Sequence, residues 1–119
     1  MITLQNGPNT NSTSEEYSLK DSTWTMIDST VIVVNLSFND LNAIKKLRDL
    51  ASDDEGNNTF ISLPLGAIAD MNHNPLVPVD ADFALNVQNI TLDMTPPQLV
   101  TFDLNLNDEQ LLLLSLIHI

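Results

Sequence analysis

The sequence predicts an all-β protein, a Greek-key β-sandwich with one short helix. Short runs of β-branched and apolar residues alternate with turn-forming residues along most of the 119-residue chain. Only one segment, residues 39–50, has helical spacing of its apolar residues. The length is that of one domain and cysteine is absent, so the fold would depend on a single core of Leu, Ile and Val.

Strands are expected where β-branched or apolar residues lie between turn-forming residues. Segment 30–36 is the strongest of these, because Val and Ile favour extended backbone. Apolar residues alternate onto both of its sides, which predicts burial of both faces. The other strands of residues 1–94 are expected at 2–5, 17–19, 24–27, 60–63, 76–79 and 83–92.

The expected helix spans residues 39–50. Ser37 lies three residues before Asp40, a start similar to a capping box, with Asp in place of the usual Glu. Three of the four basic residues of the chain lie toward its C-terminal end, where they complement the helix dipole. A solvated face is the simpler interpretation of this basic group, and a ligand-binding patch is the alternative.

The clearest alternation in the chain follows two prolines. Apolar residues occupy every second position there, at Val100, Phe102, Leu104 and Leu106. This pattern predicts a strand with one buried face, and a turn at 107–109 would return the chain as a hairpin partner over residues 110–115. Pro96 and Pro97 interrupt the ladder, because proline has no N–H to donate, and they would stiffen a junction.

Composition excludes several classes of function. Sixteen acidic residues against four basic ones give a net charge of −12, which repels nucleic-acid phosphates and anionic lipid. No apolar stretch approaches the roughly 20 residues of a membrane-spanning helix, so membrane insertion is not expected. The three glycines form no phosphate-binding loop, and His73 and His118 are the only histidines for a catalytic triad. We therefore expect no enzyme and no catalytic residues.

Three stretches resemble motifs of immunoglobulin-like repeats in large tandem-repeat surface proteins. Residues 95–104, Thr-Pro-Pro-Gln-Leu-Val-Thr-Phe-Asp-Leu, are similar to the T-x-P-x-L-V-x-F-x-L opening of such repeats. Residues 68–77 resemble the I-x-D-M-x-G-N-P-V stretch near a repeat's end, and residues 41–47 resemble its helical turn. His73 stands where the family usually has glycine, which favours a positive φ. Histidine tolerates that conformation poorly, so a distorted or less stable turn is expected there. Related modules occur in bacterial S-layer and adhesin-type proteins.

The resemblance implies an immunoglobulin-like sandwich that is cut out of register. Residues 1–94 would be one repeat lacking its first two strands, and residues 95–119 would be the opening hairpin of the next repeat. The hairpin would either project freely or fold back into the vacated position. The implied function is a structural or adhesive module of a secreted or cell-surface multi-repeat protein. Its implied partners are neighbouring repeats of the same chain, with a cell-surface protein or glycan in addition, and Pro96 and Pro97 would form the junction.

A calcium- or glycan-binding accessory module of a secreted enzyme is the alternative function. Oxygen-bearing side chains alternate as in the first positions of a calcium loop and recur a few residues later, at Asp70, Asn72, Asn74, Asp80 and Asp82. The EF-hand pattern is not fulfilled, because Ala81 stands at the twelfth loop position. An Asx-rich turn with solvated carboxylates is the simpler interpretation, and no other cofactor is expected.

Four glycosylation sequons occur along the chain. Their asparagines are Asn11, Asn35, Asn57 and Asn89. In a eukaryotic protein an outward-facing sequon would accept a glycan. Asn35 and Asn89 fall in expected strands, so their use depends on which side each faces.

Overall fold

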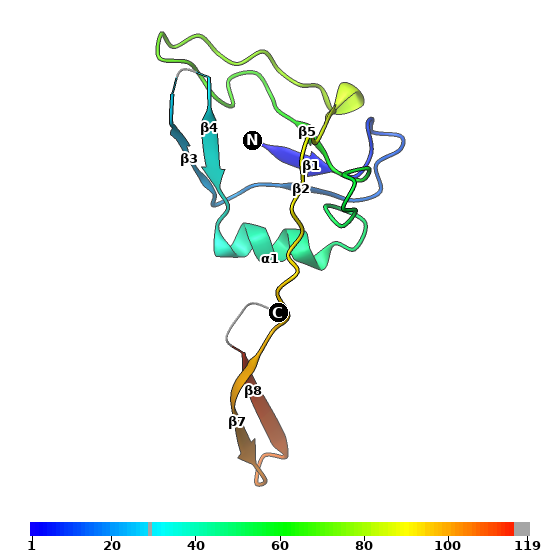
Figure 1. The fold of residues 1–119 in the computed structure, drawn as a ribbon, viewed down its shortest axis with the longest axis vertical. Coiled ribbons are helices and arrows are strands. Elements are labelled where there is room, and N and C mark those ends of the chain that lie inside the picture. Colours follow the sequence, from blue (N-terminus) through cyan, green and yellow to red (C-terminus); the bar gives the residue numbers. More distant parts are fainter. Residues whose placement is uncertain (29, 116–119) are drawn as a thin grey trace.

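The computed structural model describes residues 1–28 and 30–115. These residues form antiparallel β-sheets and one short α-helix, as predicted (Figure 1). The elements in chain order are β1 (Thr3–Gln5), β2 (Glu16–Ser18), β3 (Thr23–Met26), β4 (Ile32–Asn35), α1 (Phe38–Lys46), β5 (Phe60–Ser62), the 3₁₀ turn η1 (Ala81–Phe83), β6 (Leu85–Asn86), β7 (Leu99–Asn105) and β8 (Gln110–Ser115).

The strands form three separate sheets within this part of the chain. The largest has the order β2-β1-β5-β6, and β1 lies inside it with antiparallel neighbours on both sides. Its register places Leu4 opposite both Tyr17 and Ile61. The β3–β4 hairpin and the β7–β8 hairpin are two-stranded sheets of their own. A two-stranded sheet has little stability by itself, so each of these ribbons depends on further contacts.

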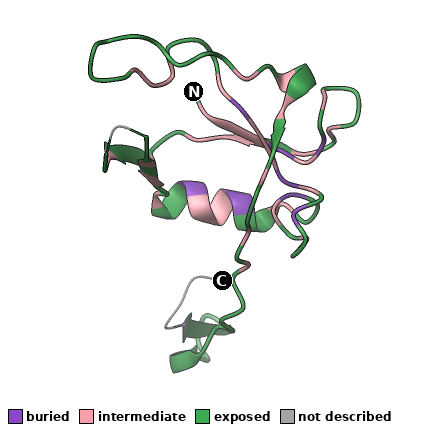
Figure 2. Ribbon diagram, turned by 45° about the horizontal axis from the view of Figure 1, so that its top comes forward, coloured by how far each residue is buried: buried purple, intermediate pink, exposed green. Residues whose placement is uncertain are grey.

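The hydrophobic core is small. Among the described residues, the hydrophobic side chains that are buried are Ile44 of α1, 7 % exposed, and Leu50, 1 % exposed. Figure 2 shows that buried positions gather on α1 and around the four-stranded sheet. Val31 and Val33 are exposed, so the burial of both faces predicted for segment 30–36 is wrong. The reason is that β4 pairs only with β3 and has no second layer over its outer face.

The β7–β8 hairpin extends away from the body of residues 1–94 (Figure 1). Its strands pair only with each other, and the described residues measure 61 × 33 × 24 Å along their principal axes. The radius of gyration is 18.2 Å, whereas a compact chain of this length has about 13.5 Å. The buried face predicted for this strand is wrong, because no other part of residues 1–28 and 30–115 covers it. Residues 116–119 of the predicted 95–119 unit lie outside the described residues.

The helix is shorter than predicted. It begins at Phe38 behind the N-cap Ser37, as the capping pattern predicts, and ends at Lys46 rather than at residue 50. Leu47 has extended backbone, with φ −83° and ψ 122°, and this turns the following chain so that Leu50 becomes fully buried. Residues 47–50 therefore form an irregular segment that buries Leu50, where a further turn of helix was predicted.

The strands predicted at 76–79 and 83–92 are mostly absent. The first is reduced to an isolated bridge between Leu63 and Val79. In the second, Asp80 caps a 3₁₀ turn by accepting a hydrogen bond from the amide of Asp82, and only Leu85–Asn86 pairs with β5. Local capping by aspartate thus competes successfully with the β-ladder here.

Candidate functional site

The β7–β8 register sorts the hairpin into two different faces. Residues directly opposite one another on antiparallel strands share a face of the sheet. Phe102 pairs with Leu113 and Leu104 pairs with Leu111, so one face is wholly apolar. We call these four residues the apolar hairpin face, and each is between 58 and 60 % exposed. The other face is mixed, because Asp103 lies opposite Leu112.

A second apolar surface lies along the helix. It is an open trough of about 500 Å³ between β1, the end of β4, α1, the loop after α1 and the chain segment 87–94. Its lining includes Leu4, Leu36, Leu41, Ile44 and Ile90. We call it the α1 trough. Several of its apolar side chains are only partly covered, so this surface and the apolar hairpin face are two apolar surfaces with no partner among the described residues.

Lys45 and Asp93 fix the point at which the chain leaves the body. The Lys45 ammonium forms an ion pair with the Asp93 carboxylate, and both side chains are partly exposed. The hydrogen bond from Lys45, together with one from the amide of Thr95, lowers the pKa of Asp93. Pro96 and Pro97, the predicted junction residues, follow three residues later and are exposed. The hairpin is thus connected to the body through a short proline-containing segment, which begins beside the Lys45–Asp93 ion pair.

A buried carboxylate positions α1 against the sheet. Asp40 is fully buried and accepts hydrogen bonds from the Tyr17 hydroxyl at 2.6 Å and from the Ser22 hydroxyl at 2.6 Å. The backbone amides of Lys20, Asp21 and Ser22 donate to it as well, at 2.9–3.1 Å. Burial alone would raise the pKa of Asp40, but these hydrogen bonds hold it well below its ordinary value.

The hydrogen bonds that surround the Asp40 carboxylate were not predicted from the sequence. Asp40 was expected to cap its own helix, whereas its carboxylate binds a turn about 20 residues earlier in the chain. The helix N-terminus is capped instead by Ser37, whose hydroxyl accepts from the Asp40 amide at 3.1 Å. Ser22 links the two, because its hydroxyl also accepts from the amide of Ser37 at 3.0 Å. The available signal was the short Asp at a position where Glu completes a capping box.

The first three calcium-candidate residues form one tight turn. Asp70 Oδ1 accepts from the amides of Asn72 and Asn74 at 2.9 and 2.8 Å, and Oδ2 accepts from the Asn74 side-chain amide at 3.0 Å. These bonds lower the pKa of Asp70. His73 has a φ of 65°, in the left-handed region that favours glycine. Each Asp70 oxygen is thus already occupied by a donor within the turn.

The other two calcium candidates are engaged elsewhere. Asp80 caps η1, and Asp82 accepts from the Thr10 hydroxyl at 2.5 Å and from the Thr10 amide at 3.1 Å. Over the described part of the chain, no group of three or more His, Asp or Glu residues is placed to hold a metal ion. Calcium binding by these five residues stays the alternative interpretation, and a direct measurement tests it.

The four sequon asparagines are exposed. Asn11 and Asn57 lie in turns, Asn35 ends β4, and Asn89 lies in irregular chain rather than in the predicted strand. The geometry thus leaves all four accessible to a modifying enzyme. Whether any is glycosylated stays a prediction.

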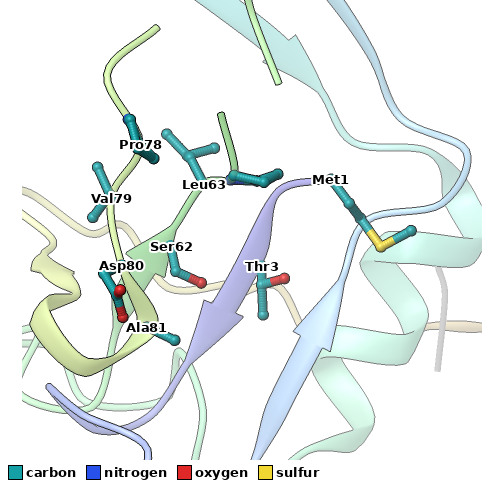
Figure 3. A pocket seen from close by; sticks show the side chains of 9 residues that line it. Met1, Thr3, Ser62, Leu63, Pro78, Val79, Asp80 and Ala81 are labelled. Atoms are coloured by element: carbon teal, nitrogen blue, oxygen red, sulfur yellow. The ribbon is translucent and has the colours of Figure 1, made fainter. Parts of the chain in front are cut away.

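A further cavity opens at the end of the four-stranded sheet. Its volume is about 480 Å³, and it is lined by the start of β1, the end of β5 and residues 78–81. Figure 3 shows the side chains around it, among which Thr3, Ser62 and Asp80 are polar. The Asp80 carboxylate accepts the Asp82 amide at 2.8 Å. The cavity therefore offers mainly apolar contact.

No protein-family model, no curated protein and no solved structure matches this chain. Within residues 1–28 and 30–115, no helix has the length and apolarity needed to cross a lipid bilayer. Inferences about function therefore depend on the two apolar surfaces and on how the chain connects them.

Proposed function

We propose that this chain is an immunoglobulin-like structural module of a secreted or cell-surface multi-repeat protein. In this proposal residues 1–94 are one repeat lacking its first two strands, and residues 95–119 begin the next. The observation that supports it best is the separation of the two apolar surfaces. The body has an open α1 trough, and the hairpin beyond Pro96 and Pro97 has an unpaired apolar face.

The proposed role is mechanical rather than catalytic. In a tandem array, each hairpin would complete the sandwich of the body that follows it in the chain. Every module would then bury surfaces that a single copy leaves exposed, which is how repeat proteins gain stability from their neighbours. The net charge of −12 would keep such an array soluble. A cell-surface protein or a glycan would bind the outer faces of the array.

The gene sequence on both sides of this segment tests the proposal. We expect further units with a Thr-Pro-Pro-like opening and an Asp-Met-Asn-like ending at a constant spacing. A catalytic domain directly adjacent, with no repeats, would instead support the accessory-module alternative.

A protein with two copies in tandem provides a second test. Its melting temperature is expected to exceed that of one copy, because one more interface forms. A Leu104→Ser change in the first copy's hairpin should remove most of that increment, whereas the same change in the last hairpin should not. Equal melting temperatures for one and two copies would contradict the proposal.

A further inference from the structure

A single copy exposes more surface than a folded protein of its mass. Its accessible area is 8947 Å². A folded monomer of 13.1 kDa exposes about 6,400 Å², so the excess is about 2,500 Å². A stable dimer buries about 800 Å² on each partner. One third of the excess would therefore supply a complete interface.

The hairpin and the α1 trough match each other in chemistry. The hairpin presents Phe102, Leu104, Leu111 and Leu113 on one face. The trough is lined mainly by apolar side chains, together with Lys45, Asp93 and three hydroxyl residues. Between residues 98 and 115 the hairpin has three acidic residues and no basic one. Lys45, at the end of α1, is paired with Asp93, and the exposed cations beside it are Lys46 and Arg48. Apolar surfaces with charges of opposite sign around them favour one defined orientation.

The connection to the hairpin directs it away from its own trough. Asp93 forms an ion pair with Lys45 of α1, and β7 begins at Leu99. Two of the five residues between them are prolines with a fixed φ near −65°. A reversal within so short a segment is strained. The trough of a second molecule is free of this restraint.

We propose that two copies of this chain exchange hairpins, so that the apolar hairpin face of each copy docks in the α1 trough of the other. The exchange closes a two-fold dimer in which neither surface remains exposed. It rests on the proposed function in one respect, since the same two surfaces would join consecutive repeats. It goes further because it names the occupant of the trough as the hairpin of a second, separate copy.

Sedimentation of the full chain tests the assembly. We expect a concentration-dependent mass of twice 13.1 kDa. Leu113→Ser should weaken the dimer by about tenfold or more, because Leu113 belongs to the apolar hairpin face. Leu112→Ser is the matched control, since Leu112 is similarly exposed but lies on the mixed face. A monomer at every concentration, or equal effects of the two changes, would overturn the exchange.

The absence of cysteine allows the contact itself to be trapped. One batch has Phe102→Cys in the hairpin, and a second, isotope-labelled batch has Leu36→Cys at the rim of the trough. After mixing and oxidation, we expect labelled–unlabelled disulfide dimers as the main product. Replacement of Leu36→Cys by Met71→Cys, exposed but outside the trough, should remove most of that product.

Three other results of this experiment would overturn the exchange. A predominance of disulfides between two Phe102→Cys chains would show that hairpins pair with each other. An intrachain disulfide in the double variant with Phe102→Cys and Leu36→Cys, formed at high dilution, would show that the hairpin folds back. Equal yields with Leu36→Cys and Met71→Cys would show random collision. The two proposals can fail separately. If the hairpins are not exchanged, the flanking gene sequence still tests the repeat proposal. If that sequence contains no repeats, the sedimentation and disulfide results still test the dimer.

Discussion

The hydroxyl of Tyr17 donates a hydrogen bond to Asp40 Oδ1 at 2.6 Å and so joins β2 to the first turn of α1. The acceptor is a fully buried carboxylate that receives further donors from residues 20–22. The Asp40 carboxylate therefore connects three segments: β2, the turn at residues 20–22 and α1. It also makes the single tyrosine of the chain a reporter of how the helix is held.

Ionisation of Tyr17 is predicted to occur two pH units above the ordinary value for tyrosine. The hydrogen bond to Asp40, with burial and the charge of Asp40 acting in the same direction, raises the pKa of Tyr17 to about 12. The folded-state value exceeds the unfolded value of 10.0. The contribution to stability is therefore complete below pH 10 and is lost as the pH rises toward 12. Absorbance at the tyrosinate band during alkaline titration measures this directly.

The Asp40→Asn variant is the control for that titration. It removes the charge but keeps the size of the side chain, so the pKa of Tyr17 should fall toward 10.0. The variant should also melt at a temperature roughly 5 °C or more below the parent, because a buried hydrogen-bond network is broken. An unchanged pKa of Tyr17 in a folded Asp40→Asn protein would contradict the assignment.

Leu50→Ala is predicted to be among the most destabilising single changes. Leu50 is 1 % exposed and is one of the two buried hydrophobic residues described. Loss of such a side chain lowers the free energy of unfolding by about 2–5 kcal/mol. Urea denaturation followed by circular dichroism measures the change. Leu65→Ala, at a 69 % exposed leucine, should change it by less than about 0.5 kcal/mol. If Leu50→Ala does not fold, the milder Leu50→Met replaces it in the comparison.

His73→Gly is predicted to stabilise the chain. The φ of 65° at His73 is strained for a residue with a Cβ atom and costs glycine nothing. The gain in free energy of unfolding should be about 1 kcal/mol. His73→Ala separates backbone strain from loss of the imidazole, since alanine keeps the strain and should give no gain. Equal melting temperatures of the Gly and Ala variants would assign the effect to the side chain.

Calcium is predicted to leave the melting temperature unchanged. Asp70 accepts hydrogen bonds within its own turn and Asp82 accepts them from Thr10. Among the described residues, no group of three or more His, Asp or Glu is placed to hold a metal ion. Binding to the folded state with calcium at ten times its Kd would add about 1.4 kcal/mol of stability, so a thermal titration is sensitive enough. A saturable rise that magnesium does not reproduce and that Asp70→Asn removes would establish the calcium-binding alternative instead.

Local patterns located most of the regular elements. Segment 30–36 predicted β4 because its β-branched residues favour extended backbone whatever they pack against. Ser37 predicted the start of α1, since a cap depends on neighbours in sequence. The end of α1 was missed because Leu50 continues the helical spacing while being buried from an irregular segment. The spacing of apolar residues indicates that a residue is buried, but it does not indicate the backbone conformation of that residue.

Features that depend on distant contacts were not predictable in the same way. The alternation around Phe102 identified the apolar side of β7 but assumed a second layer that one copy does not provide. Asp40 was assigned to its own helix because its true partners are about 20 residues away. The Asp70 turn was recognised by composition, since its hydrogen bonds span only four residues.

The ion pair between Lys45 and Asp93 lies where a pulling force would enter the body from the hairpin side. In the proposed tandem array, a pulling force would stretch residues 94–98 and load this contact before α1 or the sheet. An exposed ion pair opens at small force and re-forms quickly. The Lys45–Asp93 pair would then dissociate first, and each unit would lengthen by a few residues without unfolding. High salt screens exposed charges and would therefore lower the force needed to open the pair.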